Sequence, residues 1–199
     1  MKTALLVFWL VTALSMRAEH TMVSREVFRD NGRVSVVDTA TKVEACILSV
    51  DDPSKGKDLK RRAFVEGRYK TLPEEVRTLV VWKLLDDRSY TWDSIPACVP
   101  TYNARVRFTS GARVVDVDFC FGCSQIRILE GGVLVGEGYF SPGSDWVFRV
   151  LATQFPEDTV IRQVKKRREE TEAVRLQIEM AKARDARKVE ANSKHSASS

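Results

Sequence analysis

The sequence predicts an α+β protein with an antiparallel β-meander, packed helices and a long charged C-terminal helix. Three observations predict this class. Two β-hairpins follow each other along the chain, the first turning at Gly111-Ala112 and the second at Gly131-Gly132. A segment that begins near Thr71 carries apolar residues at helical spacing. From about Thr159 to Ala191 the chain is rich in Lys, Arg, Glu and Ala, which favour a helix.

The elements before the first hairpin follow from short apolar runs and one helix start. The runs Val34–Val37, Val43–Val50 and Ala63–Gly67 predict three strands. Thr71 and Glu74 form a capping-box pair with Pro73 between them, which predicts a helix start. The side chains predicted to form the buried face of this helix, which ends at Asp86-Asp87, are Val76, Leu79, Val80 and Trp82 to Leu85.

The first hairpin is defined by its turn and by four matched side-chain pairs. A Gly-X connection suits a type II′ turn, so the numbers of paired residues sum to 223. Apolar residues then face apolar ones, and arginines face aspartates, as cross-strand energetics favour. The four pairs are Phe108–Val115, Val106–Val117, Arg107–Asp116 and Arg105–Asp118. Continued outward, the same register places Asn103 opposite Cys120 and brings Pro100 beside Cys123, with Cys98 just beyond.

The later elements are a second hairpin and two helices. Gln125–Leu129 and Val133–Val135 predict the strands of the second hairpin, and Asp145–Gln154 a short helix capped by Ser144. The long charged helix lacks a sustained heptad repeat, which argues against a coiled coil, and disorder is expected from Ser193. The predicted organisation is a signal peptide at 1–18, a single α+β domain at 19–160, and a charged helical tail at 161–199 that ends in disorder.

The N-terminus predicts export. Lys2 is followed by the apolar run 4–15, which fits the core of a signal peptide and is short of the roughly 20 residues that span a bilayer. Ala13 with Ser15, or Ala18, supplies a cleavage site. The alternatives are an uncleaved membrane anchor and a buried N-terminal helix. We expect a secreted or periplasmic (cell-envelope) protein, in contact with the membrane only through this segment if cleavage fails.

The charge distribution gives no indication of a nucleic-acid partner. The net charge of +5 comes from the tail, because 16–161 carry 20 basic against 21 acidic residues and 162–199 carry 11 against 6. Phosphate binding needs clustered cations. The basic cluster of the tail, 165–168, is followed at once by Glu169, Glu170 and Glu172, which favours a solvated helix. We therefore expect no nucleic-acid binding, and the partners stay unknown.

Histidine is scarce, which removes many catalytic mechanisms. The only two are His20 and His195, both in terminal segments. The body therefore has no histidine for general-base catalysis, for a Ser-His or Cys-His pair, or for a mixed Cys/His metal site. The paired carboxylates of Asp116 and Asp118 suggest acid–base chemistry, but arginine partners would hold them ionised in structural salt bridges. The sequence favours a non-enzymatic protein.

The cluster of Cys98, Cys120 and Cys123 has four interpretations. The first is a structural disulfide, most simply of Cys98 with Cys120 or Cys123, as an oxidising compartment favours. The second is a zinc site on these three thiolates, with Cys46 or Asp118 as the fourth ligand. Zinc is the alternative cofactor; apart from this alternative, no cofactor is expected. The third is thiol redox chemistry, which lacks the usual helix N-terminus because a strand is predicted after Cys123. The fourth is unpaired thiols that only pack. Alternation along 113–121 places Cys120 on the more polar face, unlike an ordinary core hydrophobe.

A resemblance covers about half of the chain, from about Arg62 to Val164. Its motifs are Tyr90-x-Trp92, Cys98-x-Pro100-x-Tyr102-x-x-Arg105-Val-Arg-Phe108, Val115-Asp-Val-Asp-Phe-Cys120-Phe-Gly-Cys123 and Phe155-Pro156-x-Asp158. With them the chain resembles an uncharacterised family of bacterial secreted or envelope proteins. The resemblance implies that the three cysteines act as a unit, and it implies no activity. Some members carry a histidine shortly after Cys-x-Pro, where this chain has Thr101-Tyr102-Asn103, which weakens a metal role.

Overall fold

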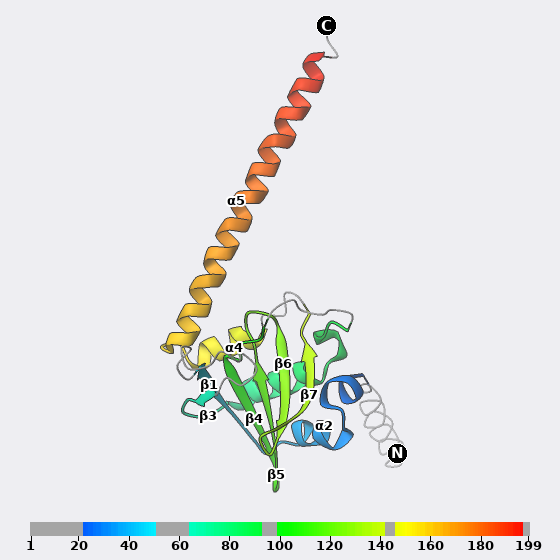
Figure 1. Cartoon of the computed structure of the whole chain (residues 1–199), viewed down its shortest axis with the longest axis vertical. Coiled ribbons are helices and arrows are strands. Elements are labelled where there is room, and N and C mark those ends of the chain that lie inside the picture. Colours follow the sequence, from blue (N-terminus) through cyan, green and yellow to red (C-terminus); the bar gives the residue numbers. More distant parts are fainter. Residues whose placement is uncertain (1–21, 51–63, 93–98, 142–145, 197–199) are drawn as a thin grey trace, which may run out of the picture. The chain divides into compact units, whose positions relative to one another are not determined.

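The computed structural model describes residues 22–50, 64–92, 99–141 and 146–196 (Figure 1). The predicted signal peptide, Cys98 and Ser144 lie outside these residues. The helices are η1 (Val23–Phe28, a π-helix), α2 (Asn31–Asp38), α3 (Glu74–Leu85), η3 (Asp87–Ser89, a 3₁₀-helix), α4 (Trp146–Gln154) and α5 (Thr159–Ser196). The strands are β1 (Lys42–Val50), β2 (Phe64–Glu66), β3 (Lys70–Thr71), β4 (Ala104–Ser110), β5 (Arg113–Phe119), β6 (Gln125–Glu130) and β7 (Val133–Tyr139). The predicted α+β class is confirmed.

The strands form one antiparallel sheet in the order β2-β1-β4-β5-β6-β7, in which β3 also pairs with β1. Strands β4 to β7 are consecutive neighbours and form the predicted meander. Strand β1 has β4 on one side and both β2 and β3 on the other. The chain divides into two compact units after Pro156, so α5 belongs to the second unit and the sheet to the first.

The register of the first hairpin is the predicted one over its whole ladder, from Ser110–Arg113 to Ala104–Phe119. Gly111 has φ of 59° and Ala112 has no positive φ, which is the pattern of a type II′ turn. The register does not continue to the predicted Asn103–Cys120 pair, because the Asn103 amide donates to the carbonyl of Phe119. In the second hairpin both Gly131 (φ 59°) and Gly132 (φ 79°) lie in the left-handed region, as a type I′ turn requires.

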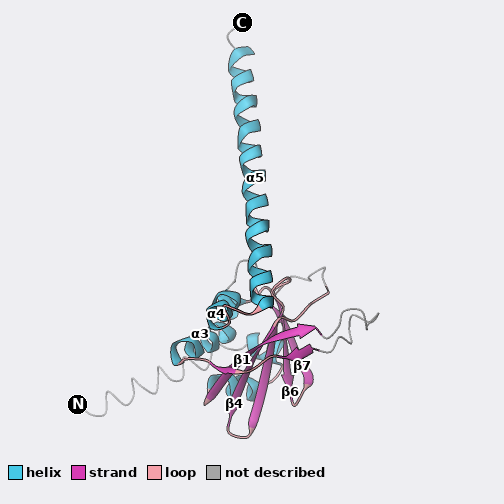
Figure 2. Ribbon diagram, turned by 90° about the vertical axis from the view of Figure 1, so that its left-hand side faces the viewer, coloured by secondary structure: helices cyan, strands magenta, loops and turns pink. Residues whose placement is uncertain are grey.

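The helices of the first unit gather on one face of the sheet, where the main core lies. Helix α2 packs on β4 and β5, and η1 packs on β7. Trp146 of α4 meets Phe119 of β5 edge to face. Figure 2 shows α3 and α4 on the same side of the strands. The buried side chains that the sheet contributes to this core include Val43, Ala45, Val106, Phe108, Val115, Val117, Phe119, Ile126 and Ile128.

The predicted strand Val34–Val37 is wrong, because this run belongs to helix α2. The side chain of Asp30 accepts a hydrogen bond of 2.8 Å from the amide of Gly32 and caps the helix. Val34, Val36 and Val37 are buried. By periodicity, a short run with three valines fits a strand or a buried helix equally well, and the Asp30 cap before it favours the helix.

The predicted capping box at the start of α3 is also wrong. Thr71 lies in β3 opposite Glu44, and Pro73 is the N-cap residue, with no side-chain cap. The buried face of α3 is narrower than predicted: Val80, Leu84 and Leu85 are buried, whereas Leu79 and Trp82 are exposed. Pairing with β1 therefore outweighs the local capping preference of Thr71.

The two C-terminal helices follow the prediction closely. Helix α4 ends at Gln154, as predicted. Helix α5 begins beside Asp158, whose Oδ1 accepts from the amide of Val160 at 2.8 Å, and it continues through Ser193 to Ser196. No helix of the described residues is long and apolar enough to cross a membrane.

Replacement of Gly136 by alanine is expected to destabilise the sheet domain by about 3 kcal/mol. A methyl group at Gly136 would overlap the carbonyl oxygen of Val27, where η1 packs on β7. Relief requires movement of a backbone segment. The matched control is Gly122→Ala, because a methyl group there would meet nothing within 4 Å. Urea unfolding of the two variants measures the difference, and equal stabilities would contradict this packing.

Candidate functional site

The candidate site lies on the face of the sheet opposite the helices. It contains a small second core of Cys46, Leu48, Tyr102 and Cys120, against which Tyr69 and Cys123 pack. Beside this core runs a network of arginines and carboxylates from β4, β5 and β6. Alternation places both on one face, since Cys46 pairs with Arg105 and Arg105 with Asp118 across neighbouring strands.

Cys120 and Cys123 are brought together by the connection between β5 and β6. Their Sγ atoms lie 2.9 Å apart, and neither is in a disulfide. Two hydrogen bonds hold this connection: the amide of Cys120 donates to the carbonyl of Gln125, and the amide of Phe121 donates to Oδ1 of Asn103. The left-handed residue of the bend is Ser124, with φ of 55°.

The predicted cysteine cluster is therefore observed for two of its three members, and Cys98 lies outside the described residues. Cys120 is only 5% exposed and belongs to the second core, so the expectation that it is not a core residue is wrong. The polar face has its own small core because apolar atoms of Leu48 and Tyr102 surround the thiol. Cys46, considered only as a fourth metal ligand, lies in the same core, which its alternation with Leu48 along one strand could have indicated.

The ionic network contains both predicted pairs. Arg105 donates to both oxygens of Asp118 at 2.6 and 3.0 Å, and Arg107 donates to both oxygens of Asp116 at 2.7 and 2.9 Å. The sequence analysis missed Arg127, which also binds Asp118 at 2.8 Å. Its signal was the connection between β5 and β6, because the pairing of these two strands places Arg127 opposite Asp118.

Glu66, the last residue of β2, and Tyr69, which precedes β3, also lie on this face. Arg105 also donates to Glu66, and Tyr69 donates to the other oxygen of Glu66 at 3.0 Å. The guanidinium of Arg107 lies 4.5 Å from the centre of the Tyr69 ring, in cation–π geometry. These contacts join the segment between β2 and β3 to the middle of the sheet.

The surroundings shift the pKa of Cys46, of two tyrosines and of Arg105 on this face. Burial raises the pKa of Cys46 to about 11, although the hydrogen bond with Tyr69 acts in the opposite direction. Burial also raises the pKa of Tyr69 and of Tyr102. For Arg105, burial opposes the charge, but the hydrogen bond and charge of Asp118 raise its pKa. Near neutral pH Cys46 is therefore a thiol, both tyrosines are phenols, and Arg105 is a cation.

The described residues contain no group of three His, Cys, Asp or Glu side chains that could hold a metal ion. Cys120 and Cys123 supply two sulfur ligands, whereas a structural zinc site takes four. The third predicted ligand, Cys98, is outside the described residues. The two described thiols alone therefore do not form a complete zinc site.

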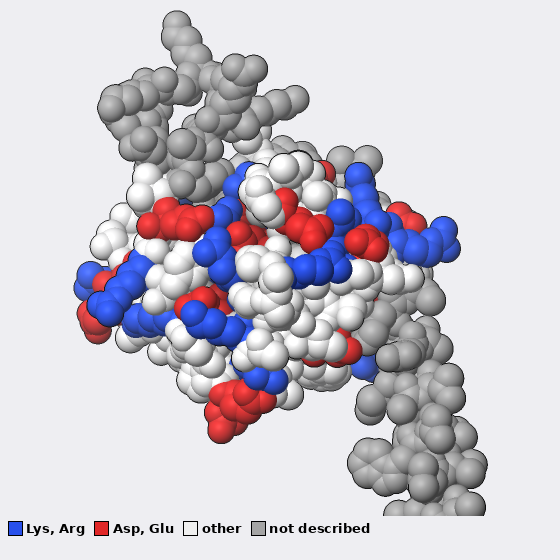
Figure 3. Space-filling view, turned by 90° about the horizontal axis from the view of Figure 1, so that it is seen from below, with Lys and Arg blue, Asp and Glu red and all other residues white. Residues whose placement is uncertain are grey.

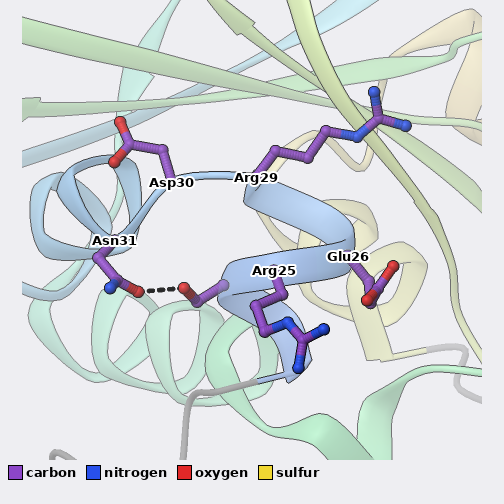
Figure 4. A pocket seen from close by; sticks show the side chains of 6 residues that line it. Arg25, Glu26, Arg29, Asp30 and Asn31 are labelled. Carbon is purple, nitrogen blue, oxygen red and sulfur yellow. Dashed lines mark hydrogen bonds between the residues drawn. The ribbon is translucent and has the colours of Figure 1, made fainter.

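A surface hollow of about 420 Å³ lies at the corner between η1 and α2. Figure 4 shows Arg25 and Arg29 pointing away from each other, so its charged side chains do not converge on one point. Ser24 donates a hydrogen bond to Oδ1 of Asn31. These polar groups serve the corner itself, and nothing about them points to a ligand.

The surface charge is mixed. On the face drawn in Figure 3, acidic and basic side chains alternate, and no broad area carries a single sign. A nucleic-acid surface needs a concentrated basic patch. This face therefore lacks the basic patch that a nucleic-acid surface needs.

Comparison with protein-family models, with curated proteins and with solved structures found no match. What the chain does is therefore inferred from its own geometry.

Proposed function

We propose that the chain is an exported, non-enzymatic protein whose Cys120 and Cys123 are joined by a disulfide that closes the β5–β6 connection. The observation that carries this proposal is the 2.9 Å between the two Sγ atoms. Export is proposed from the apolar N-terminal run, and the secreted or periplasmic compartments that it leads to are oxidising. The resemblance to bacterial secreted or envelope proteins points the same way.

The charged face supports a structural role. Each described carboxylate of the network has an arginine partner, and Asp118 has two. The raised pKa of Cys46 leaves it without the thiolate that a nucleophile needs. The sequence has no histidine between His20 and His195. A general base or activated nucleophile of the usual kinds is thus lacking on the described part of this face.

The disulfide would stabilise the end of the sheet by a modest amount. It closes a loop of four residues, Cys120 to Cys123, for which the chain-entropy relation gives about 2 kcal/mol. The gain is local, because the cross-link fixes the connection that seats Phe121 against Phe148 of α4, with ring centroids 5.4 Å apart. Reduction is therefore expected to weaken the contact between this connection and α4.

A zinc site or a thiol-redox centre on Cys98, Cys120 and Cys123 is the alternative proposal. Zinc would need Cys46 or another group to complete four ligands, and burial of Cys46 opposes the thiolate that zinc binds. A redox centre of the thioredoxin kind places its cysteines at a helix N-terminus, whereas Cys123 is followed by β6. The structural disulfide needs neither feature.

The intact mass of the native exported protein separates these proposals. The protein is alkylated in denaturant before reduction, and a second sample is analysed for metal. We expect a chain lighter by two hydrogens per disulfide, with no bound zinc; the same chain after reduction gives the reference mass. Three or four alkylated thiols together with stoichiometric zinc would contradict the disulfide.

A further inference from the structure

We infer that Cys123 is the entry thiol of this pair: a low-molecular-weight disulfide forms a mixed disulfide with Cys123, and Cys120 then displaces it. Cys123 is thereby a transient thiolation site. This inference rests on the proposed Cys120–Cys123 disulfide and adds the order in which the two sulfurs react.

The two sulfurs differ in access. Cys120 is 5% exposed, continues the β5–β6 ladder through its amide, and packs with Cys46, Leu48 and Tyr102. Cys123 is only partly buried and lies in the bend, one residue before the left-handed Ser124. Thiol–disulfide exchange requires the attacking sulfur to approach the other disulfide in line, so access limits the rate. An external disulfide can approach Cys123 more easily than Cys120.

Once Cys123 has reacted, Cys120 is in place for the second step. Its Sγ lies 2.9 Å from that of Cys123, so the displacement is intramolecular and needs no approach from solvent. With oxidised glutathione, the Cys123 thiolate attacks one sulfur, which forms a mixed disulfide and releases one glutathione thiolate. The Cys120 thiolate then attacks the Cys123 sulfur, which forms the internal disulfide and releases the second. Two protein thiols are oxidised, one external disulfide is reduced to two thiols, and two protons leave the protein.

Cys46 does not compete in either step. It is fully buried in β1, and its pKa of about 11 leaves little thiolate near neutral pH. It therefore serves as an internal reference in the full chain, because it should gain no glutathione while the sheet stays folded.

The test uses the full chain with Cys98→Ser, so that only the described thiols react, and adds Cys120→Ser or Cys123→Ser. Each reduced protein is mixed with oxidised glutathione at pH 8, and adducts are followed by mass. We expect Cys123 in the Cys120→Ser chain to react at least about tenfold faster than Cys120 in the Cys123→Ser chain, because access limits exchange. In urea the two rates should become equal, which assigns the native difference to the fold.

A second measurement avoids the variants at the reacting pair. The Cys98→Ser chain with both cysteines intact is quenched with acid at early times, and fragmentation of peptide 114–127 locates the glutathione. The inference predicts glutathione on Cys123. Glutathione on Cys120, or equal native rates in the two variants, would overturn it. If no internal disulfide forms at all, the proposed function itself fails, so the two failures are distinguishable.

Discussion

Replacement of Asp118 by asparagine is expected to lower the free energy of unfolding by about 3–5 kcal/mol, because it leaves two partly buried arginines without their buried counter-charge. The Asp118 side chain is completely buried and accepts hydrogen bonds from both Arg105 and Arg127. The guanidinium of Arg127 also lies 4.2 Å from the centre of the Tyr102 ring, so the arginine cannot leave without disturbing the second core. The amide keeps the shape of the side chain, but it removes the charge and replaces one acceptor oxygen by an NH2 group, which cannot accept from arginine.

The matched control is Glu130→Gln. Glu130 also binds two arginines, Arg33 at 2.8 Å and Arg113 at 2.7 Å, but its side chain is 29% exposed. Exposed pairs of this kind contribute about 1 kcal/mol or less. Urea unfolding of both variants measures the difference. Similar losses of unfolding free energy for Asp118→Asn and Glu130→Gln would show that burial does not determine how much the network contributes to stability.

The second large effect is expected for Phe119→Ala, which should cost about 3–5 kcal/mol because it leaves a cavity in the main core. Phe119 is buried at the end of β5 and stacks on Phe140, with ring centroids 5.8 Å apart. It also meets Trp146 of α4 at 6.4 Å, so the change weakens the contact between sheet and helix.

Trp82→Ala provides the comparison for Phe119→Ala. Trp82 is a larger aromatic residue on α3, but it is 53% exposed and contacts Lys83 of the same helix. Surface substitutions of this kind change stability by about 0.5 kcal/mol or less. Thermal or urea unfolding should therefore separate the two variants clearly. A larger loss for Trp82→Ala than for Phe119→Ala would contradict the assigned core.

The fold could be predicted wherever local signals agreed with the sheet. The turn at Gly111 and the facing of Arg107 with Asp116 specify the first hairpin from residues close in the chain. The predicted elements were wrong where a distant strand or a helix-capping side chain determined the secondary structure. Thr71 has a helix-capping pattern, but β1 lies beside it and pairs with it. Val34–Val37 resembles a strand, but Asp30 caps a helix.

The site could be predicted only as far as its hairpin. The Arg–Asp pairs follow from one register. Alternation along one strand relates Cys46 to Leu48, but the pairing of β1 with β4 and with β3, which brings Cys46 and Tyr69 beside Arg105 and Arg107, joins segments that are distant in the sequence. Gly67 illustrates this dependence: its amide donates to the carbonyl of Ile47 at 2.9 Å, and a methyl group there would lie 2.7 Å from the same oxygen. Such a close approach between distant segments is visible only in three dimensions.

The central claim is the pairing of Cys120 with Cys123, and one peptide tests it. The native protein is alkylated in denaturant without reduction and cleaved after lysine and arginine. Peptide 114–127 contains both cysteines, and the peptide with Cys46 serves as the labelled reference. We predict that peptide 114–127 is unlabelled and lighter by two hydrogens than its reduced form. The same peptide carrying a label on each cysteine would contradict the account.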